Sequence, residues 1–402
     1  MGESTVEFVE ESDEESVLDV SVKPRDVSSA VVHATDWTTE TILSQFRRGN
    51  ININPRFQRR DAWNITKKSR FIESIILGLP LPQIVLAEDK NARGKYLVLD
   101  GKQRLLTLLQ FTGYSEEGRF KDFKLRHLEV RLDLNGKSFK DLDTDPQLKE
   151  DLNQFYNQSI RSAVIRNWPN EDFLHLVFVR LNTGTVQLSP QELRQALFPG
   201  EFVSYIDEAA SDSSAIRSLL KNSDPDFRMR DVELLLRHLA FKFFISDYSG
   251  DLKKFLDKTC ETLNDNWIDK EGQIKEQVEK FDQSINAAID IFGKDNVGRK
   301  WIGVGFEPRL NRAVLDVITF YLSDDIIRSA ALENSGNVLK AFQDLCMEDE
   351  TFRNSIETTT KSLGATSNRL ILWGKRLRDV VGLDFATPDL ENNAINFSGF
   401  WR

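Results

Sequence analysis

The sequence contains only two cysteines, Cys260 and Cys346, which excludes both a disulfide framework and a zinc site built from cysteines. It also lacks any uninterrupted apolar run near the ~20 residues that a membrane span requires. The N-terminus is acidic rather than basic and then apolar, so we expect no secretory signal. These absences predict a globular protein of the reducing cytoplasm that does not associate with membranes.

What the chain does have is length, and an uneven distribution of charge. Its 402 residues are enough for two or three domains with a sizeable core. Residues 1–20 hold eight acids and no Lys or Arg, so the net charge of −10 leaves only −2 for the other 382 residues. We expect residues 1–30 to form a disordered acidic tail. Such a tail is either a solubilising extension, which the composition favours, or a mimic of nucleic acid that covers a basic surface in cis.

A basic surface is encoded between Arg47 and Arg70, where eight Lys and Arg residues stand against one acid, Asp61. A segment of this kind is either a solvated face or a contact for a nucleic-acid backbone, and the sequence does not decide between the two. If the segment contacts DNA, four of its cations are the candidate contact residues: Arg56, Arg60, Lys67 and Lys68.

The most informative stretch runs from Tyr96 to Leu109. Its first four residues are apolar and predict a short buried strand, which Asp100-Gly101 ends. Leucines then recur at helical spacing. A tight glycine turn between a strand and a helix directs unpaired N–H groups outward at the positive end of a helix dipole. Lys102 and Arg104 oppose that dipole, so we interpret the corner as an anion site, with phosphate as the expected ligand.

The pattern around this corner predicts an α+β domain over residues 31–200. Helices are expected to begin at Thr38 and at Thr66, the second ending at Gly78. Further elements are predicted from the apolar spacing: strands at 84–86, 128–134 and 159–165, helices at 146–156 and 170–181, and a helix that starts at Ser189-Pro190.

After Pro199-Gly200 the apolar residues follow helical spacing almost throughout. We therefore expect residues 201–385 to form a second, all-helical domain. Residues 386–402 show no such spacing and are expected to be a flexible C-terminal tail.

Two loops carry side chains suited to completing a phosphate pocket. The first contains Gln58 and Arg59 beside Trp63, and such groups bind phosphate and stack on a base. Trp63 is equally well explained as a core anchor. The second loop, Asn182-Thr183-Gly184, lies between two well-specified helices, where binding groups tend to concentrate.

Four motifs in order resemble the N-terminal domain of the GmrSD type IV restriction endonucleases, a family of bacterial phage-defence systems. The motifs are Phe57-Gln58-Arg59 with Trp63, Ile72-Glu73-Ser74-Ile75-Ile76 with Gly78, Leu99-Asp100-Gly101-Lys102-Gln103-Arg104, and Asn182-Thr183-Gly184 with Leu188-Ser189 and Glu192-Leu193. The resemblance covers about residues 36–200 and implies a ParB/sulfiredoxin-like fold.

The resemblance also implies binding and hydrolysis of a nucleoside triphosphate, whether ATP, GTP or CTP, at the family's Asp-Gly-Gln-Gln-Arg signature. In this chain Lys102 replaces the first Gln of that signature, which adds a cation that seeks phosphate. Asp100, Gln103 and Arg104 are the expected catalytic residues, and Asp100 would also hold Mg²⁺. Gly101 and Lys102 would bind the nucleotide together with Gln58, Arg59, Asn182, Thr183 and Gly184.

The chain departs from full-length family members in its histidines. It has four, none of them beyond residue 238 and none in a His/Asn-rich metal motif. An HNH-type nuclease site in this polypeptide is therefore not expected, and a partner would supply cleavage. The leading hypothesis is an NTP-using defence protein that acts on or senses DNA. The rivals are a non-catalytic DNA-binding or adaptor protein, and a ParB-like nuclease subunit without an HNH site. A homo-oligomer is compatible with each of them.

Overall fold

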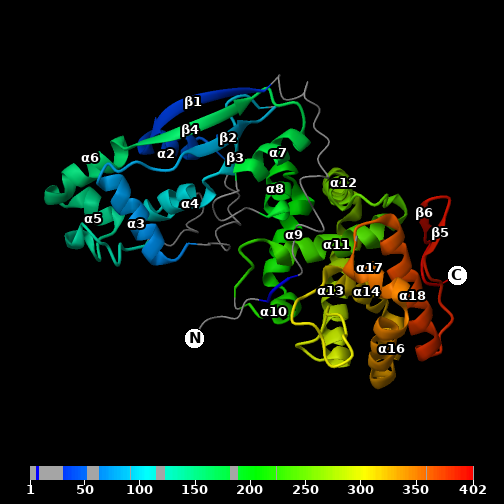
Figure 1. Ribbon diagram of the computed structural model, residues 1–402. Helices are drawn as coiled ribbons and strands as arrows, with labels where there is room; N and C mark the ends of the chain where they lie inside the picture. The colour runs from blue at the N-terminus through cyan, green and yellow to red at the C-terminus, as the bar shows by residue number, and fades with distance from the viewer. Residues whose placement is uncertain are drawn as a thin grey trace. The chain divides into compact units, whose positions relative to one another are not determined.

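A computed structural model describes residues 6–8, 30–51, 63–90, 92–114, 123–181, 189–222, 224–358 and 360–401 (Figure 1). The chain divides into two compact units. The N-terminal unit is Val20–Ser189, and the helical unit is Pro190–Arg402 together with Met1–Asp19. The second unit thus begins eleven residues earlier than the sequence analysis places it, so that the helix after Ser189 belongs to it.

The N-terminal unit contains a mixed four-stranded sheet. Its strands are β1 (Val31–Thr38), β2 (Ile84–Glu88), β3 (Tyr96–Asp100) and β4 (Ser159–Arg166), in the order β1-β4-β2-β3. β1 and β3 run antiparallel to their neighbours, whereas β2 and β4 are parallel. Buried β-branched and leucine residues dominate β2 and the inner positions of β4, as expected for strands covered by helices.

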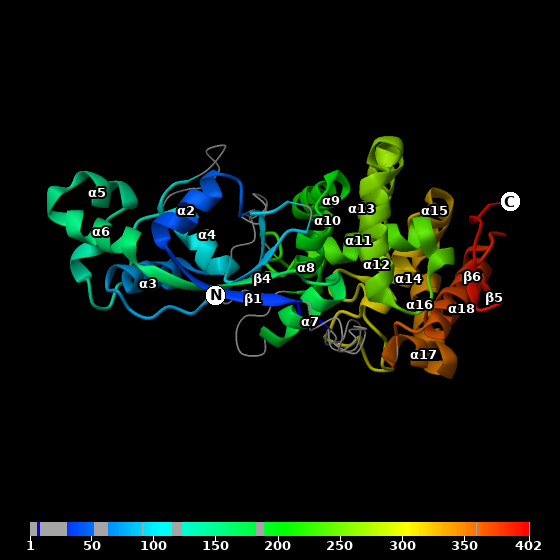
Figure 2. The same cartoon turned by 90° about the horizontal axis from the view of Figure 1, so that it is seen from above.

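Helices of the N-terminal unit gather on one face of this sheet (Figures 1 and 2). They are α2 (Thr39–Arg47), α3 (Ile65–Ile76), α4 (Lys102–Phe111), α5 (Phe139–Thr144) and α6 (Lys149–Asn157). Their apolar stripes and the inner face of the sheet form one core, in which Ile72, Leu86 and Leu105 are fully buried. A further helix, α7 (Glu171–Leu181), packs against β3. The mixed helix and strand content agrees with the expected α+β class.

Helix starts show where local side chains decide the boundaries. The Thr38 hydroxyl accepts a hydrogen bond from the Thr41 amide and caps α2, as the sequence predicts. The expected cap of α3 at Thr66 is wrong. Asn64 accepts from the Lys67 amide instead, and the helix begins at Ile65. Asn is the stronger N-cap of the two, so the helix starts at the earlier position.

The strand expected at 128–134 is also wrong, because these residues form a loop that ends in a 3₁₀ turn, Leu132–Leu134. The helix expected at 146–156 is divided into a 3₁₀ turn, Pro146–Leu148, and α6. The strand predicted at 159–165 and the helix predicted at 170–181 correspond to β4 and α7.

The helical unit is built from eleven helices in the part of the chain that is described. They are α8 (Pro190–Leu197), α9 (Glu201–Asp212), α10 (Ser214–Leu220), α11 (Arg230–Phe244), α12 (Leu252–Asp265), α13 (Trp267–Phe292), α14 (Arg312–Leu322), α15 (Asp325–Glu333), α16 (Ser335–Glu348), α17 (Glu350–Glu357) and α18 (Leu363–Val381). Every residue of α14 is buried, which makes it the central helix.

In place of the flexible C-terminal tail expected from the sequence, residues 386–401 contain a short antiparallel pair, β5 (Asp389–Glu391) and β6 (Ala394–Asn396). Ile395 and Phe400 in this segment are buried, and the Phe400 ring packs against Phe320 and Tyr321 of α14. Contact with the central helix therefore orders the end of the chain.

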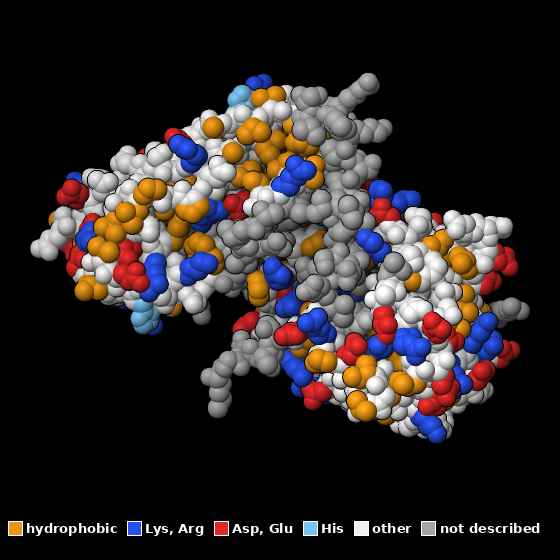
Figure 3. All heavy atoms as spheres, viewed as in Figure 1, with side chains coloured by type: hydrophobic (Ala, Val, Ile, Leu, Met, Phe, Trp, Pro, Cys, Tyr) orange, Lys and Arg blue, Asp and Glu red, His pale blue; other side chains and the backbone are white. Residues whose placement is uncertain are grey.

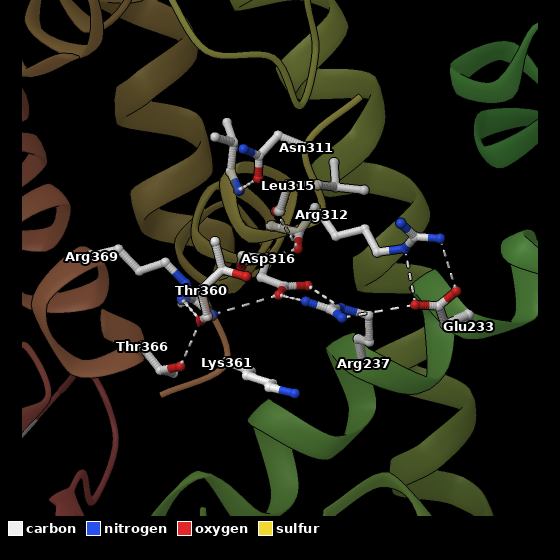
Figure 4. A network of polar contacts seen from close by, with 12 residues as sticks. Glu233, Arg237, Asn311, Arg312, Leu315, Asp316, Thr360, Lys361, Thr366 and Arg369 are labelled. Atoms are coloured by element: carbon white, nitrogen blue, oxygen red, sulfur yellow. Dashed lines mark hydrogen bonds and ion pairs between the residues drawn. The ribbon is translucent and has the colours of Figure 1, made fainter. Parts of the chain in front are cut away.

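A buried ionic network joins α11, α14 and α18 (Figure 4). Arg237 forms two hydrogen bonds with Asp316, at 3.1 Å (Nε to Oδ1) and 2.5 Å (Nη2 to Oδ2). Arg312 Nε lies 2.9 Å from Glu233 Oε1, and Arg369 Nη2 lies 3.9 Å from Asp316 Oδ2. The three arginine side chains are each 2 % exposed. Removing one partner would leave an uncompensated buried charge, so the network fixes how these helices pack.

Within the described ranges, no helix combines the length and the apolar character needed to cross a bilayer.

Candidate functional site

The strand–glycine–helix corner predicted from the sequence is present in the structure. β3 ends at Asp100, Gly101 is the N-cap residue with φ of 95°, and α4 begins at Lys102. This backbone conformation is one that residues with a Cβ rarely adopt. A Cβ at Gly101 would also lie only 3.1 Å from Ile84 Cγ2. Glycine is therefore required here both by the backbone conformation and by the close approach of β2.

Arg104 turns back towards this corner. Its Nη2 donates to Asp100 Oδ2 at 2.7 Å, and the two side chains are 11 % and 26 % exposed. A Cβ built on Gly101 would lie 3.4 Å from both Nε and Nη2 of Arg104, so the guanidinium lies across the bare face of the glycine. This bond to Asp100 uses one of the five N–H donors of the guanidinium. Other donors of the guanidinium therefore remain for an anion, although the Asp100 carboxylate offsets part of the positive charge of the arginine.

The N-terminus of α4 differs from most helix starts in this protein. Gly101 offers no side-chain cap, and the first turn contains no acid. By contrast, side-chain oxygens of Thr38, Asn64 and Asn311 cap α2, α3 and α14. Amides at the positive end of a helix dipole, joined by Lys102 and Arg104, make the local potential at the start of α4 favourable for an anion.

Lys102 and Gln103 both begin α4 but differ in their surroundings. Lys102 is buried and is engaged in contacts of its own, rather than extending into solvent. The side-chain oxygen of Gln103 is buried without a hydrogen-bond partner among the described residues. A buried amide oxygen without a partner is costly, so a ligand or an ordered water that donates to it would be stabilising.

The expected Mg²⁺ site rests on Asp100 alone in the described part of the chain. Among the described residues, no group of three or more His, Cys, Asp and Glu side chains could hold a metal ion. A hard cation held by one carboxylate takes its remaining ligands from phosphate oxygens and water, as Mg²⁺ commonly does.

Seven of the expected site residues lie outside the described residues. They are Arg56, Gln58, Arg59, Arg60, Asn182, Thr183 and Gly184. The two segments that contain them follow described elements that contact β3. Ile51, just before the first segment, bridges to Tyr96, and α7, just before the second, packs against the same strand.

The two described cations of the predicted DNA contact, Lys67 and Lys68, lie in the first turn of α3. Lys67 is exposed, with Nζ 4.8 Å from the centre of the Trp63 ring, whereas Lys68 is half-buried and engaged in contacts. Trp63 itself packs edge-on against Phe71 and contacts the core, which supports its interpretation as a core anchor. On the face drawn in Figure 3, Lys and Arg side chains are interspersed with Asp and Glu among the described residues.

Glu73 belongs to one of the four motifs, and its carboxylate anchors the backbone of a distant loop. Its carboxylate accepts from the amides of Glu129, Val130 and Arg131, at 3.3, 2.9 and 2.7 Å. Burial raises the pKa of this carboxyl, but the three amides and the nearby charge of Arg70 outweigh burial and hold the pKa below its ordinary value. One turn earlier, the Ser69 hydroxyl accepts from the Arg126 amide. In the sequence, the spacing of Ser69 and Glu73, four residues apart on one face of a helix, was the signal that could have indicated this loop contact.

Residues 39–199 match the sequence profile of a family described as "GmrSD restriction endonuclease, N-terminal domain". No curated protein and no solved structure matches the chain.

Proposed function

We propose that the chain is a restriction-type defence protein that binds and hydrolyses a nucleoside triphosphate at the Asp100–Arg104 corner, because residues 39–199 match the N-terminal domain of the GmrSD restriction endonucleases. The observation that carries the proposal is the position of the Arg104 guanidinium. It lies across Gly101, at the uncapped start of α4, and is held there by Asp100.

Each residue of the corner has a role that follows from its chemistry. The bare backbone at Gly101 lets phosphate approach, and the amides at the start of α4 donate to its oxygens. Arg104 and Lys102 neutralise the charge that develops on the phosphoryl group. Asp100 binds Mg²⁺ or orients the attacking water, and the amide of Gln103 offers that water a further contact.

The remainder of the pocket is proposed from residues beyond the described ranges. Gln58 and Arg59 would approach the nucleotide from one segment, and Asn182, Thr183 and Gly184 from another. The mixed sheet that positions the corner is compatible with a ParB/sulfiredoxin-like fold, in which a Gly-x-x-Arg corner binds phosphate. We include that fold in the proposal.

DNA is the proposed macromolecular partner, because the family is one of restriction endonucleases. Arg56, Arg60, Lys67 and Lys68 would contact its backbone, and binding would then weaken steeply with salt as counterions are released. Since the chain has four histidines and none beyond residue 238, strand cleavage would be the task of a partner protein.

The test is phosphate release from ATP, GTP and CTP with Mg²⁺ by the full chain, with and without DNA. We expect turnover of at least one nucleotide, and a loss of binding and turnover in Arg104→Ala. Arg131→Ala is the matched control, because Arg131 also pairs with a partly buried carboxylate, that of Asp151, in the same unit. Normal turnover by Arg104→Ala would refute the assignment. No release with any nucleotide, combined with salt-sensitive retention of DNA, would establish the adaptor function instead.

A further inference from the structure

Three residues of the acidic N-terminal segment lie against the helical unit. The Leu310 amide donates to the Glu7 carbonyl at 2.8 Å, and Phe8 pairs with Leu310 as a parallel β-bridge. Val6 is buried, with 6 % of its surface exposed. An extended segment whose backbone pairs with a neighbouring segment in this way is bound as short peptides are bound at a strand edge.

The Phe8 ring contacts two arginines that begin two different helices. The guanidinium carbon of Arg230, at the start of α11, is 4.7 Å from the ring centre, and that of Arg312, at the start of α14, is 4.5 Å away. Arg230 Nη1 also donates to the Val6 carbonyl, at 3.4 Å. Contacts between a guanidinium and an aromatic face strengthen when they are shielded from water.

Carboxylates of the helical unit hold both arginines in place independently of Val6–Phe8. Arg230 pairs with Asp226 at 2.5 Å, and Arg312 with Glu233 at 2.9 Å, the second pair being part of the network in Figure 4. Because these ion pairs fix the positions of the two guanidiniums, the guanidiniums form a preorganised binding site for an aromatic ring. Preorganisation lowers the entropic cost of binding.

We propose that the start of α11 and residues 309–312 form a docking site for a short extended segment that contains an aromatic residue, and that Val6–Phe8 occupies this site in cis. This inference goes beyond the proposed function and does not depend on nucleotide binding.

The geometry indicates which features of the segment matter. Glu7 lies 3.6 Å from Arg309, but the two side chains are 75 % and 53 % exposed, and ion pairs in solvent contribute little. Recognition therefore rests on the Phe8 ring and on the backbone contacts. Glu7→Gln provides a matched control, because it changes the same three-residue segment without removing the ring.

The first experiment measures hydrogen exchange of the Leu310 amide in the full chain. We expect exchange in Phe8→Ala to be about tenfold faster or more than in wild type, corresponding to about 1.4 kcal/mol of docking free energy, and unchanged in Glu7→Gln. The rate in wild type should not vary with protein concentration. Equal protection in wild type and Phe8→Ala would overturn the proposal. Protection that rises with concentration would show docking of a second copy instead, which would overturn the cis assignment.

The second experiment titrates a fluorescent synthetic peptide of residues 1–15 into both full chains. The tethered segment has an effective concentration far above that of the added peptide, so wild type should bind the peptide at least about tenfold more weakly than Phe8→Ala does. The same peptide with Phe8→Ala should bind neither chain. Equal affinity for the two chains would contradict occupancy in cis, and thermal unfolding of Phe8→Ala near the wild-type temperature verifies that the variant is folded.

Discussion

Replacing Asp100 by Asn separates the two tasks assigned to the corner. In the structure the Asp100 carboxylate takes one hydrogen bond from Arg104 at 2.7 Å and thereby competes with an incoming phosphate for the same guanidinium. Asn keeps the shape of the side chain but removes the charge. We therefore expect Asp100→Asn to bind nucleotide more tightly than wild type when Mg²⁺ is absent, yet to hydrolyse it poorly.

The expected gain in nucleotide affinity follows from the strength of the Asp100–Arg104 ion pair. Hydrogen bonds between charged groups are worth about 1.5–3 kcal/mol when buried, and the exposure of 11 % and 26 % places this pair near the lower end. A gain of about 1.4 kcal/mol corresponds to about tenfold tighter binding. Loss of a group that positions the metal or the water should slow turnover by about a hundredfold or more.

The assay combines equilibrium binding of a fluorescent nucleotide, with and without a chelator, and single-turnover hydrolysis. Asp151→Asn is the control, because Asp151 also pairs with an arginine in the same unit. Weaker binding by Asp100→Asn in the chelator, to the same degree as Arg104→Ala, would refute the reasoning that Asp100 competes with phosphate. Unchanged turnover would remove Asp100 from the mechanism.

Three further substitutions test the surroundings of the site and the core of the helical unit. Gly101→Ala should cost about 1–2 kcal/mol in urea unfolding and weaken nucleotide binding, because its Cβ would strain the backbone and displace Arg104; an unchanged midpoint and affinity would contradict this. Glu73→Gln should lower the free energy of unfolding by about 1–3 kcal/mol at neutral pH, because it removes the charged acceptor of the loop amides. Glu129→Gln is the control and should have little effect, because the Glu129 side chain is exposed. The pKa of Glu73 in the folded protein lies below the ordinary value of 4.5. Its contribution to the free energy of unfolding is therefore fully present above pH 4.5 and should be lost as the pH falls through the pKa of the folded state. Unfolding measured as a function of pH tests this. Burial lowers the pKa of Lys242 to about 8, so the free energy of unfolding of wild type should rise between about pH 8 and 10.5. Lys242→Met should show almost no change over this pH range and should be more stable than wild type by about 1 kcal/mol or more at pH 7. Parallel stability curves for the two proteins would show that the buried ammonium does not destabilise the fold.

The corner could be predicted from the sequence because each of its parts is local. A run of apolar residues, a glycine at the turn and leucines at helical spacing each indicate one element, and together they locate Asp100 and Arg104. The same holds for the cap at Thr38. The sequence around Arg104 does not determine where its side chain points. Ile84, on the neighbouring strand β2, helps to define the space above Gly101 in which the guanidinium lies.

The failures have the opposite origin, in contacts between residues far apart in the sequence. Alternating residues at 128–134 resemble a strand, but their amides are taken by Glu73, more than fifty residues earlier. Phe400 at the end of the chain packs on α14, which its irregular surroundings do not indicate. Phe8 lies in an acidic segment whose composition predicts disorder, and its partners Leu310, Arg230 and Arg312 lie more than two hundred residues further along the chain.

The central claim is that the start of α4 binds the phosphates of a nucleotide. A structure of the full chain with a non-hydrolysable triphosphate analogue and Mg²⁺ tests it most directly. The account predicts phosphate oxygens within hydrogen-bond distance of the Arg104 guanidinium and of the amides after Gly101, with the metal beside Asp100. Phosphates bound elsewhere, with Arg104 still paired only to Asp100, would contradict it.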